Sequence, residues 1–174
     1  VYFSFLGGAP FVAGNILGIS ATQMGLYFMF VAVGYICGNF ISGRIAERVG
    51  VFRMIAVGSS LPAAAIVVIS TFLILGIENP ATLFVPMFFV GLGNGVCLPI
   101  SVSGAVSVRP DLAGTASGLS GACQVGFGAI SSALVAWMLS ETMWPDTSWP
   151  MIAVMLVCVV ATLVSVISVR ISER

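Results

Sequence analysis

The stretch GRIAERVGVFR, residues 43–53, places a cluster of charge between two long apolar runs. It holds four charged residues, in a chain of 174 residues that has only six basic and six acidic residues in all. Soluble domains carry about 25% charged residues, whereas this chain has 7% charged residues, 59% hydrophobic residues and a mean hydropathy of +1.16. The stretch is therefore interpreted as a polar loop that joins two membrane-spanning helices.

Apolar runs long enough to cross a hydrocarbon core, which takes about 20 residues, recur along the rest of the chain. Their interiors lack charged residues, as expected in lipid, because a charge at a span centre costs about 2.5–3.5 kcal/mol. Complete spans are expected at 25–43, 53–76, 82–106, 113–139 and 150–169, and a shorter one at 1–14. The short run lacks the basic start of a signal peptide, so we expect a truncated first helix and a chain that is a fragment. The sequence predicts an all-α integral membrane protein, a bundle of six transmembrane helices.

The basic residues are distributed asymmetrically between the two sides of such a bundle. With six crossings, all of the arginines fall on one side of the membrane, and these are Arg44, Arg48, Arg53, Arg109, Arg170 and Arg174. The loops expected on the other side, near 15–22, 77–81 and 140–149, have no arginine but contain three acidic residues and two tryptophans. Cytoplasmic loops carry an excess of Lys and Arg, so the arginine side and the C-terminus are expected to be cytoplasmic.

The spacing of residues within 43–53 carries further information beyond a plain arginine anchor, which is the simpler interpretation. The pattern of Gly43, Glu47-Arg48, Gly50 and Arg53 resembles the Gly-x-x-x-Asp-Arg-x-Gly loop signature of the major facilitator superfamily. It departs from the signature in having Glu for Asp and a basic cluster reduced to Arg53, as in the weaker copy between spans eight and nine. The resemblance implies a cytoplasmic gate in which Glu47 pairs with a helix end of the other half of the transporter.

Three further segments narrow the resemblance. GGAPFV at 7–12, GLGNGVCLP at 91–99 and AGTASGLSGACQVGFGA at 113–129 look like the bicyclomycin-resistance (Bcr/CflA) branch of drug:proton antiporters. The resemblance implies spans seven to twelve of a transporter in a bacterial cytoplasmic membrane, with the N-terminal half missing. It also implies coupling to a proton gradient without any other cofactor. No carboxylate lies within these spans, so the proton-binding group is expected in the missing half.

Polar residues recur on one face of the 113–139 span. Ser120, Gln124, Phe127 and Ser131 follow each other at helical spacings of three and four residues, and polar groups inside a membrane usually face a cavity. The alternative is that Gln124 only hydrogen-bonds a neighbouring helix. Small residues on the opposite face are expected to allow close helix packing, and these are Gly118, Ala122 and Gly126.

The same reasoning applies to two other spans. Asn94 shares a face with Met87, and Tyr35 and Asn39 share one with Phe28, while Gly34 and Gly38 form a GxxxG pair for packing. The resemblance implies that spans seven, eight, ten and eleven line the cavity, and that nine and twelve are peripheral. The candidate substrate-cavity residues are Phe28, Tyr35, Asn39, Met87, Asn94, Ser120, Gln124, Phe127 and Ser131.

Several functions are disfavoured by the residues that the chain lacks or scatters. There is no His, the four Cys lie in different spans, and no paired carboxylates or nucleophile–base set is present, so neither a metal site nor an enzyme is expected. No basic stripe suggests nucleic acid. The expected partners are the lipid bilayer, a small-molecule substrate and the missing half. A proton-coupled exporter of small lipophilic compounds is the first hypothesis; a metabolite or sugar facilitator and a non-transporting membrane subunit remain open.

Overall fold

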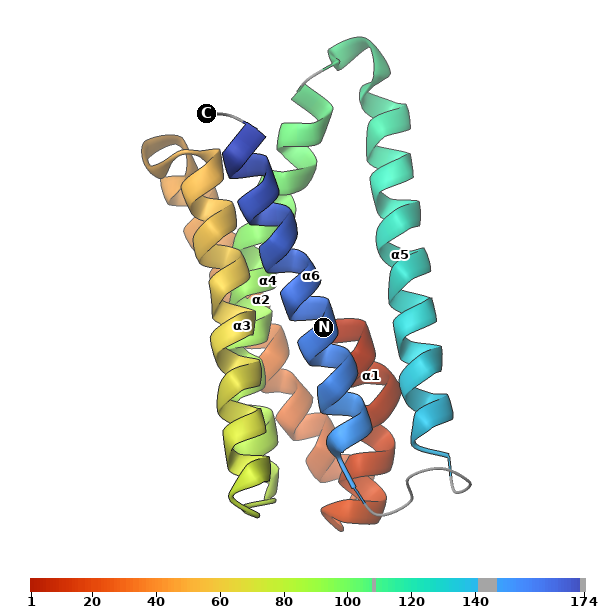
Figure 1. Ribbon diagram of the computed structural model, residues 1–174. Coiled ribbons are helices and arrows are strands. Elements are labelled where there is room, and N and C mark those ends of the chain that lie inside the picture. The colour runs from red at the N-terminus through yellow and green to blue at the C-terminus, as the bar shows by residue number, and fades with distance from the viewer. Residues whose placement is uncertain (108, 141–146, 173–174) are drawn as a thin grey trace.

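The computed structural model describes residues 1–107, 109–140 and 147–172, and these are almost entirely helical (Figure 1). The helices are α1 (Tyr2–Phe11), a π-turn (Val12–Ile16), α2 (Ala21–Val49), α3 (Val51–Ile74), α4 (Pro80–Ser107), a 3-10 turn (Pro110–Leu112), α5 (Ala113–Met138) and α6 (Trp149–Ser172). No strand occurs in the described residues. Helices α2 to α6 are each long and apolar enough to cross a membrane. The expected all-α membrane fold is confirmed.

Helices α2, α4 and α6 extend beyond the expected apolar runs at both ends, because polar residues cap or continue them. Helix α2 has 29 residues and begins at Ala21, four residues before the expected span, since Ser20 and Gln23 form a capping box. The Gln23 backbone N–H donates to the Ser20 hydroxyl over 3.3 Å, and the Ser20 N–H donates to the Gln23 side chain over 3.0 Å. At the other end, Gly50 alone separates α2 from α3, with a φ of +89° that favours glycine.

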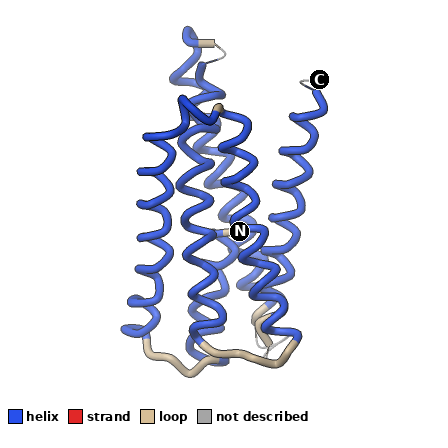
Figure 2. The backbone as a smooth tube through the Cα atoms, turned by 90° about the vertical axis from the view of Figure 1, so that its left-hand side faces the viewer, coloured by secondary structure: helices blue, strands red, loops and turns tan. Residues whose placement is uncertain are grey.

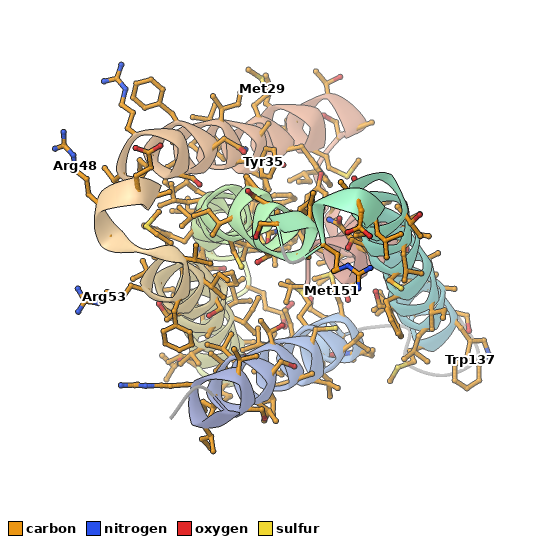
Figure 3. The ribbon with its side chains drawn as sticks, turned by 90° about the horizontal axis from the view of Figure 1, so that it is seen from above. Met29, Tyr35, Arg48, Arg53, Trp137 and Met151 are labelled. Atoms are coloured by element: carbon orange, nitrogen blue, oxygen red, sulfur yellow. The ribbon has the colours of Figure 1, made fainter. Side chains whose placement is uncertain are left out.

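Every described arginine lies at the same end of the bundle. The α2–α3 turn, the α4–α5 connection and the C-terminal end of α6 lie together at the top of Figure 1, and the α1–α2 and α3–α4 connections lie at the bottom (Figures 1 and 2). Arg48 and Arg53 point outward at the rim of this end (Figure 3). Glu78 and Trp149 belong to the opposite end. Four of the charged or Trp residues used above to assign the two sides of the bundle lie outside the described residues: Glu141, Trp144, Asp146 and Arg174.

Helix α4 is central, and its glycines bring it into backbone contact with α2. A Cβ added at Gly91 would collide with the carbonyl oxygen of Val31, and one added at Gly95 with that of Tyr35. The contact is reciprocal, because Cβ atoms at Gly34 and Gly38 would collide with carbonyl oxygens of α4. Such close approach gives TM helices their dispersion contacts and weak Cα–H···O bonds. The pair α2–α4 is therefore packed backbone to backbone.

The other face of α4 packs on α3 in the same way. A Cβ at Gly93 would collide with the Gly58 carbonyl oxygen and with the Pro62 ring, and one at Gly58 would lie 2.8 Å from the Cβ of Cys97. Successive helical residues are rotated by about 100°, so Gly93 faces away from the Gly91–Gly95 side. Alternating glycines in one stretch thus hold α4 between two neighbours.

The small-residue stripe of α5 behaves differently from the prediction. A Cβ at Gly118 or Gly126 would meet no atom within 4 Å, and Ala122 is exposed. The prediction that this stripe packs closely is therefore wrong for the described chain, because α5 stands apart from α2 and α3 (Figure 1). It meets α1 instead, where Gly128 lies against the ring of Phe3 and a Cβ at Gly7 would come within 2.6 Å of the Ser132 hydroxyl.

An aromatic core closes the half of the bundle away from the arginines. The Phe5 ring of α1 lies 5.2 Å from that of Phe28 and 5.7 Å from that of Phe84, measured between centroids, and Tyr27 stacks on Phe84 at 4.8 Å. Met87 is fully buried in the same cluster. This core ties α1, α2 and α4 together at one end.

We expect Gly95→Ala to lower the free energy of unfolding by about 1–3 kcal/mol, the usual cost of overpacking. The added methyl group would force α4 away from the Tyr35 carbonyl. Thermal or detergent-induced unfolding of the purified full-length protein measures this. Gly118→Ala is the matched control and should be neutral or slightly stabilising, since the site is open and alanine favours helix. Equal destabilisation by both variants would contradict the packing described.

Candidate functional site

A cavity of about 500 Å³ lies among the helices, and each of the six contributes to its wall. The volume falls within the range of about 300–1,000 Å³ typical of small-molecule sites. Most of the wall is apolar. Its residues are Val1, Tyr2 and Phe3 of the α1 end, Val31, Ala32 and Tyr35 of α2, Gly58, Ser59 and Pro62 of α3, Gly91, Asn94, Cys97 and Leu98 of α4, Gln124 of α5, and Val159 and Thr162 of α6.

Four polar side chains of the lining residues have no hydrogen-bond partner among the described residues: the hydroxyls of Tyr2 and Tyr35 and the amides of Asn94 and Gln124. Tyr35 lies on the side of α2 toward α4, whereas Met29 lies on the opposite side (Figure 3). Hydroxyl and amide groups at membrane depth need partners. A solute or water in the cavity would supply them.

The glycines of α4 explain why Asn94 faces the cavity. Gly93 is turned toward α3 and Gly95 toward α2. A residue between them in the helix is rotated by about 100° from each, so Asn94 points to the remaining side, where α5 and α6 complete the wall. The orientation of this amide is therefore a consequence of backbone packing.

The cavity contains no charged side chain among its lining residues. In the described residues, no group of three His, Cys, Asp or Glu could hold a metal ion. Arg109 and Asp111 form an ion pair of 2.9 Å in the α4–α5 connection, which lowers the pKa of the Asp111 carboxyl, but this pair is exposed. The chemistry available in the cavity is hydrogen bonding and apolar contact.

Of the nine residues predicted from the sequence, Tyr35, Asn94 and Gln124 line the cavity. Met87 does not, because it is 0% exposed and packs in the aromatic core. Phe28 packs against Phe5 in the same core. These two predictions need correction: both residues lie on the expected helix faces but nearer the end that the core fills.

The remaining four predicted residues lie on α2 and α5 outside the cavity wall. The Asn39 amide donates to the Tyr35 carbonyl over 2.9 Å. Ser120 donates to the Ala116 carbonyl and Ser131 to the Gly128 carbonyl, so both hydroxyls are bonded within α5. Phe127 is 74% exposed. The polar stripe predicted on α5 covers more helical turns than the cavity does, and Gln124 is the stripe residue that lines the cavity wall.

Helices α3 and α6, expected to be peripheral, contribute residues that sequence reasoning missed. Gly58, Ser59 and Pro62 come from α3, and Val159 and Thr162 from α6. A hydroxyl in a nearly uniform aliphatic span, as Thr162 is in α6, was the available signal. This signal is weak, because a Thr whose hydroxyl bonds the backbone of its own helix can also face lipid.

The residues of the predicted gate motif lie at the arginine end, away from the cavity wall. Gly50 forms the α2–α3 turn, and the Gly50 N–H donates to the Ala46 carbonyl over 2.9 Å. Glu47, Arg48 and Arg53 are exposed, and none forms an ion pair with another described residue. Gly43 has open space around it. These charges are available to a partner outside the described chain.

Comparison with known proteins finds several relatives. The chain is 30% identical over 170 residues to a bicyclomycin resistance protein homolog of Haemophilus influenzae, covering 94% of this chain and 39% of that protein. It is 32% identical to an uncharacterized MFS-type transporter of Bacillus subtilis, covering 91% of this chain and 38% of that protein. It is 31% identical to multidrug resistance protein D of Escherichia coli, covering 74% of this chain and 32% of that protein. The chain thus spans about two fifths of the length of these relatives or less. No family model and no solved structure matches it.

We expect Asn94→Leu to leave the free energy of unfolding unchanged or to raise it, because the Asn94 amide has no partner to lose among the described residues. Asn79→Leu is the matched control. The Asn79 side-chain oxygen accepts the Thr82 N–H over 2.9 Å at the start of α4, and loss of such a cap costs about 1 kcal/mol. Unfolding of the two purified full-length variants tests this. A larger loss for Asn94→Leu than for Asn79→Leu would assign Asn94 a structural role.

Proposed function

The chain belongs to the major facilitator superfamily, and we propose that it forms the C-terminal six-helix half of a secondary transporter that exports small lipophilic or weakly polar compounds. The observation that carries the proposal is the cavity without charged side chains, in which four hydrogen-bonding side chains have no partner among the described residues. Such a wall suits solutes with large apolar surfaces and a few polar groups. It offers no cation to pair with an anionic substrate.

The named relatives favour export of drugs over the two alternatives. One is called a bicyclomycin resistance protein homolog and another a multidrug resistance protein. A sugar site would be expected to have a largely polar wall, because each buried hydroxyl of a sugar needs a partner, whereas most of this wall is apolar. A non-transporting subunit would have no use for unpartnered polar groups around a cavity of this size.

Transport by alternating access requires this bundle to rock against a second one around a shared midplane site. We propose that the second bundle is an N-terminal half, since the relatives are much longer than this chain. The proton whose gradient drives export would bind in that half, because no Asp or Glu lies within the apolar runs at 25–43, 53–76, 82–106, 113–139 and 150–169. The exposed Glu47, Arg48 and Arg53 would pair with the other half to close the cytoplasmic gate.

The orientation of the bundle is part of the same proposal. The end that carries Arg44, Arg48, Arg53, Arg109 and Arg170 would face the cytoplasm, by the excess of basic residues in cytoplasmic loops. The α6 C-terminal end lies there too (Figure 1). The membrane would be the bacterial cytoplasmic membrane. The identity of the substrate and the number of protons exchanged per substrate would depend on both halves of the transporter.

Gln124→Ala in the full-length protein is expected to lower the efficiency of export of at least some compounds, by roughly fivefold for the loss of one hydrogen bond to the solute. Membrane abundance should not change, because the Gln124 amide has no partner among the described residues. Efflux of a fluorescent lipophilic dye from energised cells, normalised to protein abundance, measures the effect.

Val157→Ala is the matched control, since Val157 is 69% exposed on α6 and does not line the cavity. Its efflux should equal that of the parent. If the parent exports no dye above cells without the protein, export is the wrong function. If Gln124→Ala exports every compound tested as well as Val157→Ala does, the cavity is not the transport site.

A further inference from the structure

We propose that Ser59 of α3 and Thr162 of α6 form a subsite of the cavity that accepts hydrogen bonds from N–H or O–H groups of the exported compound. This inference rests on the proposed function and extends it to the chemistry of the solute. Both residues line the cavity, and both come from helices that family resemblance would place at the periphery. Helices α3 and α6 lie side by side on one flank of the bundle (Figure 3).

The protons of these two hydroxyls are already committed. The Ser59 hydroxyl donates to the Ala56 carbonyl over 3.1 Å, and the Thr162 hydroxyl donates to the Cys158 carbonyl over 2.8 Å. A hydroxyl has one proton and two acceptor lone pairs. Each oxygen therefore presents only acceptor capacity to the cavity.

The backbone beside Ser59 contains one carbonyl that lacks its helical hydrogen bond. Pro62 has no N–H, so it cannot donate the helical hydrogen bond to the carbonyl of Gly58. Gly58 and Pro62 both line the same wall as Ser59. The Gly58 carbonyl lies against Gly93 of α4 in the α3–α4 contact, so the acceptor that α3 presents to the cavity is the Ser59 hydroxyl.

The opposite wall of the cavity, on α2, α4 and α5, differs in its hydrogen-bonding groups. The amides of Asn94 and Gln124 and the hydroxyl of Tyr35 can each donate as well as accept, and none is bonded within the described chain. The cavity is therefore polarised between an acceptor wall on α3 and α6 and an adaptable wall on α2, α4 and α5. A solute with an N–H or O–H group at one end of an apolar body can place that group against the acceptor wall and its own acceptors against the adaptable wall.

The positions of the two hydroxyls are well defined. Ser59 is only 5% exposed and follows Gly58, which packs against Gly93 of α4. Thr162 is β-branched, which restricts its first side-chain torsion. Ser59 is buried and Thr162 is exposed, so an unmatched polar group of the solute is costly chiefly beside Ser59.

The test measures binding rather than transport. Fluorescence anisotropy would follow binding of two rhodamine methyl esters to the purified full-length protein: one with free amino groups and its tetramethylated counterpart. The dyes share one aromatic body and one charge, and only the first has N–H donors. We expect the parent to bind the free-amino dye roughly fivefold more tightly, and Ser59→Ala and Thr162→Val each to reduce that preference.

The controls are hydroxyls on the same helices that bond their own backbone outside the cavity wall. Ser60 donates to the Val57 carbonyl and Ser168 to the Val164 carbonyl, each within 2.9 Å. Ser60→Ala and Ser168→Ala should keep the parent's preference. A parent that binds both dyes equally or binds neither, or a preference that survives in both Ser59→Ala and Thr162→Val, would overturn the subsite. Binding with preference but without efflux from cells would instead refute export and leave the subsite standing.

Discussion

Backbone contact between α4 and its two neighbours is the interaction on which the rest of the structure depends. Lipid tails are as apolar as leucine, so helices in a membrane gain little from hiding apolar side chains from one another. Close approach supplies the attraction instead, and it requires residues without a Cβ at the crossing. Gly91 and Gly95 meet α2, and Gly93 meets α3. This packing fixes the rotation of α4 about its axis, and with it the direction of Asn94. One short stretch thus determines both the bundle and the polar feature of its cavity.

The packing also divides the bundle into a tight part and a looser part. Helices α2, α3 and α4 touch through glycines on both faces of α4, whereas α5 contacts α1 and leaves Gly118 and Gly126 in open space. The cavity lies between these parts, and its wall draws on each of the six helices. Because the wall carries no charged side chain, selection there rests on the placement of a few hydrogen-bonding groups. That chemistry tolerates varied apolar solutes while still distinguishing donors from acceptors.

The fold could be predicted from the sequence because long uncharged apolar runs leave few alternatives in a membrane. Part of the site could be predicted as well: polar residues at mid-span, such as Asn94 and Gln124, are costly unless they face a cavity. Helical periodicity gives the face of a helix but not the depth of a residue along it, so it places Met87 at the cavity although this residue fills the aromatic core. Helical periodicity also does not indicate that α3 and α6 contribute residues to the cavity wall. Ser59 and Thr162 bond their own helices and look neutral in the sequence, and only the three-dimensional arrangement brings them to the wall.

The central claim is that exported compounds occupy the cavity beside α4, and protection of Cys97 from alkylation tests it most directly. Cys97 lines the cavity, whereas Cys37 is exposed on α2 outside its wall. Two versions of the full-length protein would each retain one of these residues as the only cysteine, and a membrane-permeant maleimide would be added with increasing concentrations of the free-amino rhodamine. The account predicts that the dye slows alkylation of Cys97 in a saturable manner and leaves Cys37 unaffected. Alkylation of Cys97 at a rate independent of the dye would contradict it.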